Sequence, residues 1–140
     1  MSDGAGFVLD ASALLAHLLA EPGGDVVRDT LAEHAAVMSA VNWAEVLSRL
    51  ASAGADPYEV AQRLTSEAAL GDVLTVIALE DSDGPAIARL RPTTRHLGLS
   101  LADRACLALA QRLELPVLTT DRAWAPVSYT HLTLPTKRIV

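Results

Sequence analysis

Short apolar segments with strand character alternate with amphipathic helical segments along this chain, and this alternation is the feature that most limits its possible folds. Strands are expected at residues 7–10, 36–39, 73–79 and 117–119, where apolar side chains gather. Helices are expected at residues 11–20, 25–34, 41–53, 56–70, 83–90 and 100–113. Strands that alternate with helices predict a parallel sheet with helices on both faces, so we expect one α/β domain.

Residues that typically start or stop helices mark several of these boundaries. Asp56 followed by Pro57 is typical of a helix start, and Ser100 is expected to cap the helix that follows it. Gly54 is expected just beyond the end of the preceding helix. Pro92 is expected to end or interrupt the helix that opens near residue 83, because proline disfavours a helical conformation at the residue before it.

The composition indicates a cytoplasmic protein with one hydrophobic core. The chain has 140 residues, of which 51% are hydrophobic, and its one cysteine, Cys106, lies in an apolar stretch where we expect it to be buried. One cysteine forms no internal disulfide, which agrees with a reducing compartment. The N-terminus has no pattern of a secretory signal, and no apolar run reaches the roughly 18 residues typical of a membrane span, so no membrane partner is expected.

The formal net charge of −6 argues against a general nucleic-acid coat, which would be basic, but it is compatible with a nuclease whose active site is acidic. One basic segment stands out, with Arg89, Arg91, Arg95, His96 and Arg104. These residues form either a solvated helix face or a surface that contacts phosphate. Trp124 is expected to pack beneath the edge of the sheet rather than to stack on a base.

Four carboxylates are the candidate functional residues: Asp10, Glu45, Asp103 and Asp121. Asp10 and Asp121 follow predicted strands, whereas Glu45 and Asp103 lie about one turn into predicted helices. Side chains at these positions can converge on one crevice at the carboxyl edge of an open α/β sheet. Carboxylate oxygens suit Mg²⁺ or Mn²⁺, so the set indicates metal-dependent phosphodiester hydrolysis.

Three polar neighbours are expected to support these acids from a second layer: Ser12 beside Asp10, Asn42 one helical turn before Glu45, and Thr119 two residues before Asp121. The alternative for each acid is structural. Asp10 and Asp121 would then cap the elements that follow them, Asp103 would favour the dipole of its helix, and Glu45 would be a solvated helix residue.

Four segments that contain these acids resemble, in order, the four successive motifs of PIN-domain proteins, above all the VapC-type toxins of bacterial toxin–antitoxin pairs. The segments are LDASAL at 9–14, SAVNWAEV at 39–46, LSLADRA at 99–105 and LTTDRAW at 118–124. Each motif alone is weak, but all four in order with this spacing are specific. The resemblance covers residues 7–125, nearly the whole predicted domain.

The resemblance implies a Rossmann-like three-layer α/β/α PIN domain with a central parallel sheet. It also implies a metal-dependent endoribonuclease that uses Mg²⁺ or Mn²⁺, held by the acids that match Asp10, Glu45, Asp103 and Asp121. Family members usually form homodimers and are held inactive by a cognate antitoxin protein. Which RNA is cleaved, how many ions take part and which surface forms the dimer stay open, with helices 25–34 and 56–70 as candidate partner surfaces.

Three competing interpretations remain. The chain could be a catalytically inactive PIN-like module that acts through a protein partner, or a truncated domain without function. A receiver-like phosphotransfer domain also carries acids at strand ends, but it needs a second acid at the first strand and a lysine late in the domain. Here Asp10 stands alone and Lys137 is the only lysine of the chain.

The last segment, residues 126–140, differs in composition from residues 1–125. It contains the only lysine and no alanine, although alanine is frequent before it. It resembles translated sequencing-adapter read-through, so we expect a PIN domain at 1–125 followed by a non-native tail at 126–140. On this interpretation the tail packs poorly and replaces the final strand of the family. The alternative is a genuine turn and strand.

Overall fold

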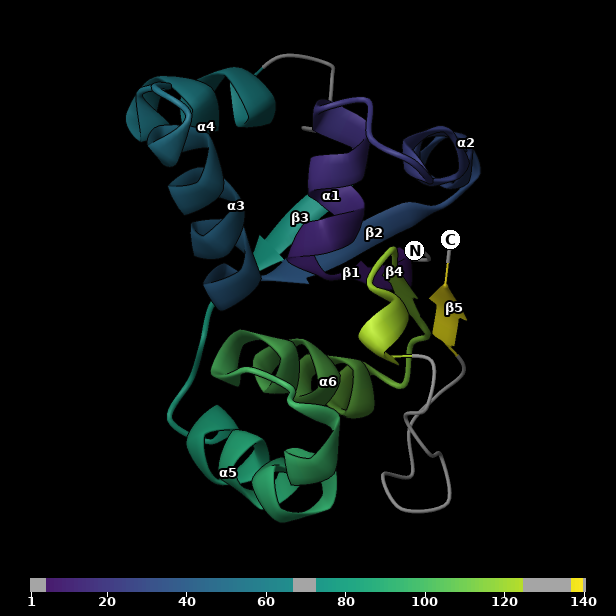
Figure 1. The fold of residues 1–140 in the computed structure, drawn as a ribbon, viewed down its shortest axis with the longest axis vertical. Coiled ribbons are helices and arrows are strands. Elements are labelled where there is room, and N and C mark those ends of the chain that lie inside the picture. The colour runs from purple at the N-terminus through teal and green to yellow at the C-terminus, as the bar shows by residue number, and fades with distance from the viewer. Residues whose placement is uncertain (1–4, 67–72, 125–136, 140) are drawn as a thin grey trace.

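Five parallel strands form one sheet in the order β3-β2-β1-β4-β5 (Figure 1). The computed structural model describes residues 5–66, 73–124 and 137–139. The strands are β1 (Ala5–Leu9), β2 (Ala35–Ser39), β3 (Leu74–Ile77), β4 (Val117–Thr119) and β5 (Lys137–Ile139). Chain order runs outward from β1 to β3 and then returns to the other side of β1 with β4, so the direction of winding reverses between β1 and β4.

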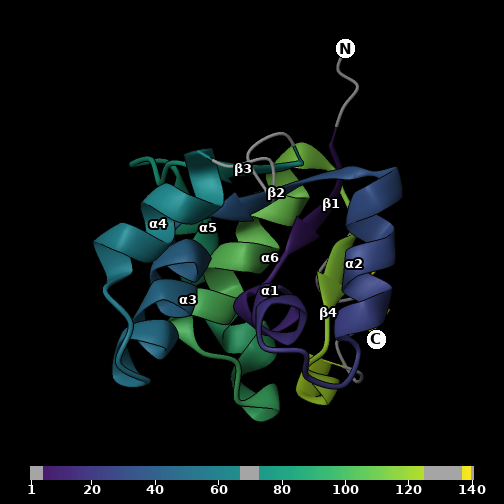
Figure 2. The ribbon, with the colours of Figure 1, turned by 90° about the horizontal axis from the view of Figure 1, so that it is seen from above.

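Helices cover both faces of the sheet, as Figures 1 and 2 show. The elements are α1 (Ala11–Leu18), α2 (Gly24–Glu33), α3 (Ala40–Ser52), α4 (Pro57–Ser66), α5 (Asp83–Thr94) and α6 (Leu101–Leu113), with short 3₁₀ turns η1 (Arg95–Leu97) and η2 (Arg122–Trp124). The predicted three-layer α/β/α architecture with a central parallel sheet is therefore confirmed.

The period-two pattern of the strands divides the core into two clusters, one on each face. Val8, Val37 and Val117 pack with α5 and α6, whereas their neighbours Leu9 and Leu118 pack with α1, α2 and α3. Successive strand side chains point to opposite faces of a sheet, so both layers of helices are fixed by the same short strands. The buried strands have no polar face, as expected for a parallel sheet.

The predicted burial of two single residues is confirmed. Cys106 is fully buried in α6, and burial raises the pKa of its thiol well above the usual range, so the thiol is kept in its unreactive form. Trp124 is also fully buried and belongs to the cluster that contains β4 and α6.

The predicted helix boundaries are right within a few residues, except at Pro92. Gly54 follows α3 with φ of +101°, a conformation that suits glycine. Pro92 was expected to end or break its helix, but α5 continues through it to Thr94. The backbone carbonyl that loses its donor belongs to Ala88, which is exposed to water, and the buried Leu90 and Thr94 hold the last turn against the core.

Part of the tail adopts a structure that the sequence interpretation did not expect. Residues 137–139 form β5 and pair in parallel with β4, with Val117 opposite Lys137 and Thr119 opposite Ile139. The sequence interpretation expected a poorly packed tail in place of the family's final strand, and these three residues instead form the edge strand of the sheet, as its alternative of a turn and strand would have it. Residues 125–136 and 140, like residues 67–70 of the predicted fourth helix, lie outside the described part of the chain. The non-native origin of the tail stays a prediction.

Within residues 5–66, 73–124 and 137–139, none of the helices combines the length and apolar character that a membrane crossing requires.

Candidate active site

The four predicted acids line one cavity of about 260 Å³ at the carboxyl ends of the strands. Asp10 follows β1, Asp121 follows β4, Glu45 lies in the helix after β2, and Asp103 lies in the first turn of α6. The cavity therefore opens where the direction of winding reverses, the position at which open α/β sheets bind ligands. Its remaining lining residues are Ala11, Ser12, Leu15 and Arg49.

Asp10 is the buried centre of this cavity, with 3% of its surface exposed. It caps α1, because its Oδ1 accepts a hydrogen bond from the Ala13 amide at 2.9 Å. Its oxygens also accept hydrogen bonds from the Ser12 hydroxyl at 2.8 Å and the Thr119 hydroxyl at 2.5 Å. Burial raises the pKa of Asp10 to about 6, although these three hydrogen bonds lower it.

The two hydroxyls are oriented by the backbone of the β4 end. Ser12 Oγ accepts a hydrogen bond from the Thr120 amide at 3.1 Å, and Thr119 Oγ1 accepts one from the Asp121 amide at 3.0 Å. Because each hydroxyl oxygen accepts from an amide, its own hydrogen is available for the Asp10 carboxylate. The end of β1 and the end of β4 are thus joined by a hydrogen-bond network that centres on the Asp10 carboxylate.

Asp103 and Asp121 both make capping hydrogen bonds, which is the structural role considered above. Asp103 Oδ2 accepts from the Ser100 amide at 2.9 Å, and the Ser100 hydroxyl accepts from the Asp103 amide at 3.1 Å, which is a complete capping box. Asp121 Oδ1 accepts from the Ala123 amide at 2.9 Å. In each case the other carboxylate oxygen accepts no hydrogen bond from the described residues, so it remains free for a ligand.

Glu45 stands on the more open wall of the cavity, on α3. Partial burial raises its pKa, the Asp103 charge raises it further, and a hydrogen bond with Asn42 lowers it. Asn42 is buried, and its Nδ2 donates to the Ala102 carbonyl at 3.0 Å, so it ties α3 to the first turn of α6. This bond holds the helix that carries Glu45 beside the helix that carries Asp103.

The donor set fits a hard divalent cation in its chemistry, because it consists of carboxylate oxygens gathered around one buried acid. It is not a preassembled coordination shell. Across residues 5–66, 73–124 and 137–139, no three acids, cysteines or histidines already stand at the spacing of metal ligands. Asp10 itself is buried and held by hydrogen bonds, whereas Asp103 and Asp121 are partly exposed and Glu45 is exposed.

Sequence reasoning assigned one residue of the cavity no role in the site, although it lies on the same polar stripe as Asn42 and Glu45, and it misplaced another residue. Arg49 lines the cavity, and its spacing of four residues from Glu45 on a helix was the available indication. Arg104 was grouped with the exposed basic segment, but only 6% of its surface is exposed and its Nη1 donates to the Ile87 carbonyl at 3.1 Å. The other four members are exposed, so Arg104 does not share a phosphate surface with them.

Comparison with known proteins agrees with this architecture. The model of a family described as PIN domain matches residues 7–128. No curated protein matches the chain.

Solved structures of toxin–antitoxin proteins are similar over most of this chain. VapBC-5 of Mycobacterium tuberculosis, of the VapBC family of toxin–antitoxin systems, is 25% identical over 97% of this chain and 98% of its own, with a TM-score of 0.58. VapC20 of the same organism, a sarcin–ricin-loop-cleaving toxin, has a TM-score of 0.70 at 10% identity, covering 88% and 95%. A toxin–antitoxin complex from Klebsiella pneumoniae has a TM-score of 0.62 at 22% identity, covering 87% and 92%.

Proposed function

The chain belongs to the PIN-domain family, and we propose on this basis that it is a VapC-type toxin that hydrolyses RNA phosphodiester bonds with the help of Mg²⁺ or Mn²⁺. The observation that carries the proposal is the convergence of four acids from four separate segments on one cavity. Capping alone would explain three of these acids one by one, but it does not explain why they share one cavity with Glu45, which makes no capping hydrogen bond with any described residue.

In this proposal Asp10 and Asp103 hold the cation directly, and Asp121 completes the site directly or through water. Glu45 either adds a ligand oxygen or accepts a hydrogen bond from the attacking water. A bound divalent cation supplies a more acidic water and stabilises negative charge on the phosphate. Ser12 and Thr119 orient the Asp10 carboxylate, and Asn42 orients Glu45 through its contact with α6.

The test is cleavage of a structured RNA by the purified protein with Mg²⁺ or Mn²⁺ and with a chelator. Hydrolysis by water leaves a 5′-phosphate and a 3′-hydroxyl, so these ends are expected. Products that end in a 2′,3′-cyclic phosphate would show attack by the ribose and would contradict the proposal. Asp10→Asn protein, purified in the same way, is the control for a contaminating nuclease, and Asp25→Asn, which changes an exposed acid on α2, should keep its activity.

A catalytically inactive PIN-like module is the second candidate function. The capping bonds of Asp103 and Asp121 favour it, because they give both acids a structural reason to be present. Titration with Mn²⁺ separates the two candidates. The nuclease is supported if the unchanged protein cleaves RNA and binds Mn²⁺, and if Asp10→Asn loses this metal binding. The module is supported if the protein binds a partner but does not cleave RNA.

The proposed partners are an RNA substrate, a cognate antitoxin protein and a second copy of the chain, in the cytoplasm. Similar solved structures include a toxin–antitoxin complex, which supports the antitoxin. An adjacent gene for a small DNA-binding protein would support the same partner. Selectivity for one RNA would depend on its shape and loops, because proteins recognise RNA mainly through these features.

A further inference from the structure

The cavity of the four acids contains one basic side chain, Arg49, which is held only loosely. Arg49 lies on α3 one turn after Glu45, with 60% of its side chain exposed. Its Nη2 lies 3.8 Å from Oε2 of Glu21, in the loop between α1 and α2. That separation is too long for a hydrogen bond, and exposed ion pairs of this kind are weak and screened by salt.

Arg49 pairs across the rim of the cavity rather than along its own helix. A spacing of four residues would allow an ion pair with Glu45. Among the described residues no such pair lies within 4.0 Å, and Arg49 is not among the causes that shift the pKa of Glu45. Glu45 therefore stays available to the acid cavity, and the guanidinium lies toward the α1–α2 loop.

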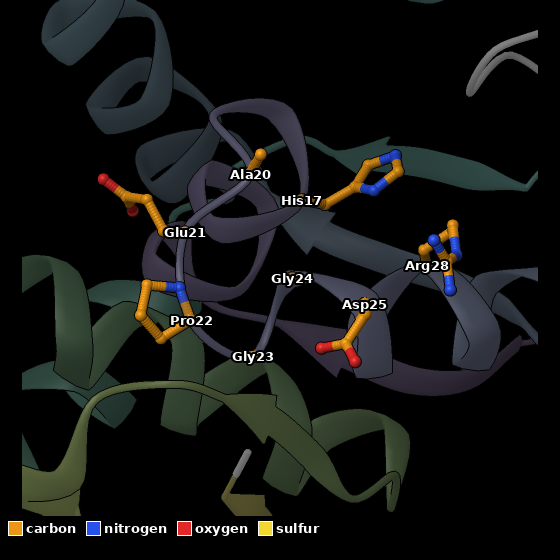
Figure 3. A pocket seen from close by; sticks show the side chains of 8 residues that line it. All are labelled: His17, Ala20, Glu21, Pro22, Gly23, Gly24, Asp25 and Arg28. Atoms are coloured by element: carbon orange, nitrogen blue, oxygen red, sulfur yellow. The ribbon is translucent and has the colours of Figure 1, made fainter.

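Glu21 also lines a second cavity, of about 540 Å³, with His17, Pro22, Asp25 and Arg28 among its other residues. Figure 3 shows Glu21 on the side of this cavity opposite His17 and Arg28. Because Arg49 lines the acid cavity and Glu21 lines the second one, their ion pair marks the border between the two hollows.

The other basic groups of the second cavity are less available to an anion. Arg28 is engaged by Asp29, with its Nη2 3.0 Å from Oδ1. Burial lowers the pKa of His17, and the Arg28 charge lowers it further, so His17 is neutral near pH 7. Arg49 is thus a permanent cation that lines the acid cavity and is held only by a weak ion pair.

We propose that Arg49 binds a backbone phosphate of the RNA that enters the acid cavity, and that Glu21 competes with this phosphate for the guanidinium. The inference rests on the proposed function and adds a substrate-binding residue to it. A polyanion that approaches four carboxylates on a chain of net charge −6 is repelled, so a cation at the rim favours its entry. A guanidinium can bind phosphate through two parallel hydrogen bonds, which makes it a stronger partner than the distant Glu21.

The experiment measures binding of a fluorescent single-stranded RNA, in Mg²⁺, to full-length Asp10→Asn protein, so that cleavage does not interfere. Arg49→Gln in this background should weaken binding about tenfold. It should also reduce the slope of log affinity against log salt by about 0.7, the value for one phosphate of a single strand. Glu21→Gln should tighten binding about threefold, because it removes the competitor.

The double variant gives the sharpest result. The gain from Glu21→Gln should vanish when Arg49→Gln is also present, because the two residues act on one guanidinium. Arg49→Lys should recover only part of the lost affinity. Persistence of the Glu21→Gln gain without Arg49 would overturn the inference, since Glu21 would then act only as a repulsive charge.

The matched control is a second exposed ion pair, between Arg63 and Glu59 on α4, whose arginine side chain is 65% exposed against 60% for Arg49. Arg63→Gln and Glu59→Gln remove the same charges away from the cavity and should leave affinity within about twofold, as for surface charges without a phosphate contact. Equal losses for Arg49→Gln and Arg63→Gln, or no RNA binding by the parent protein, would contradict the inference. The proposed function is tested separately: if the protein with Asp10 intact does not cleave RNA, the proposed function fails.

Discussion

The two walls of the acid cavity differ in how firmly they are built. The wall formed by the ends of β1 and β4 holds Asp10 almost fully buried, with hydrogen bonds from Ser12, Ala13 and Thr119. The α3 wall carries Glu45 and Arg49, both exposed, and its ion pair to Glu21 spans 3.8 Å. The buried wall is fixed before any ligand arrives, whereas the α3 wall can move its side chains to meet one.

This difference suggests a division of labour between the walls. A carboxylate that binds a cation benefits from a fixed position, because reorganisation during the reaction is costly. Side chains that meet a long and variable polymer benefit from freedom. Changes to the buried wall should therefore affect catalysis and stability strongly, and changes on the periphery should have small effects.

The largest effect is expected for Asp10→Asn, which keeps the shape of the side chain but removes its charge. Metal-dependent RNA cleavage should fall by about a thousandfold or more, because the central ligand is lost. Circular dichroism should show an intact fold, because the amide oxygen can still accept from the Ala13 amide. An unfolded variant would instead show that the capping role of Asp10 dominates.

The next effect concerns the pH dependence of stability without metal. The pKa of Asp10 is about 6 in the folded protein against 3.8 as the reference value, so the folded state favours the protonated carboxyl. Its contribution to stability is fully present below pH 3.8 and is lost as the pH rises through 6. The difference of about two pH units corresponds to about 3 kcal/mol.

Chemical denaturation with a chelator between pH 4 and 8 measures this contribution. The free energy of unfolding of Asp10→Asn relative to the unchanged protein should rise across that window, because the variant has no charge to bury. If the relative stability of the two proteins does not change with pH, the pKa of Asp10 is the same in the folded and unfolded protein. Burial would then not destabilise the charged carboxylate, and the two walls would differ less than proposed.

A smaller effect is expected for Thr119→Val, which removes one hydroxyl at nearly constant volume. Asp10 then loses an orienting hydrogen bond, and the Asp121 amide loses its acceptor. Cleavage should fall about 10- to 100-fold, as for other residues that orient a metal ligand. Thr30→Val is the matched control, because Thr30 is also buried but its hydroxyl donates to the Val26 carbonyl in α2. Comparable loss of cleavage in both variants would assign the effect to general destabilisation.

The smallest effect is expected for Ser100→Ala, which removes the side-chain half of the α6 capping box. The protein should lose about 1 kcal/mol of stability, while cleavage changes little because Asp103 keeps its bond from the residue 100 amide. Ser82→Ala is the matched control, because Ser82 precedes α5 without making a side-chain capping bond. A large loss of cleavage in Ser100→Ala would show that the periphery also fixes the geometry of the site.

Local patterns in the sequence predicted much of the fold. The alternation of apolar segments indicated the parallel sheet, and the four acids were identified because strand ends and helix starts meet at one edge of such a sheet. Ser12 and Thr119 were singled out because they lie within two residues of an acid along the chain, and both contact Asp10.

The remaining features depend on contacts between distant segments, which a single sequence does not display. Arg104 is charged, yet α5 packs over it and its Nη1 reaches the Ile87 carbonyl. The continuation of α5 through Pro92 depends on the burial of Thr94. The Arg49–Glu21 pair joins residues from two elements whose separation is set by packing rather than by spacing along the chain.

Gly24 gives the corner between α1 and α2 an unusual intolerance to variation. A methyl group added there would lie 2.2 Å from the Ala16 carbonyl oxygen and 2.8 Å from its carbon. These are backbone atoms, which cannot rotate aside as a side chain could, so even alanine would force the two helices apart. In a saturation library, position 24 should accept glycine alone. A protein with another residue at this position would need a different backbone path in the α1–α2 loop that carries Glu21.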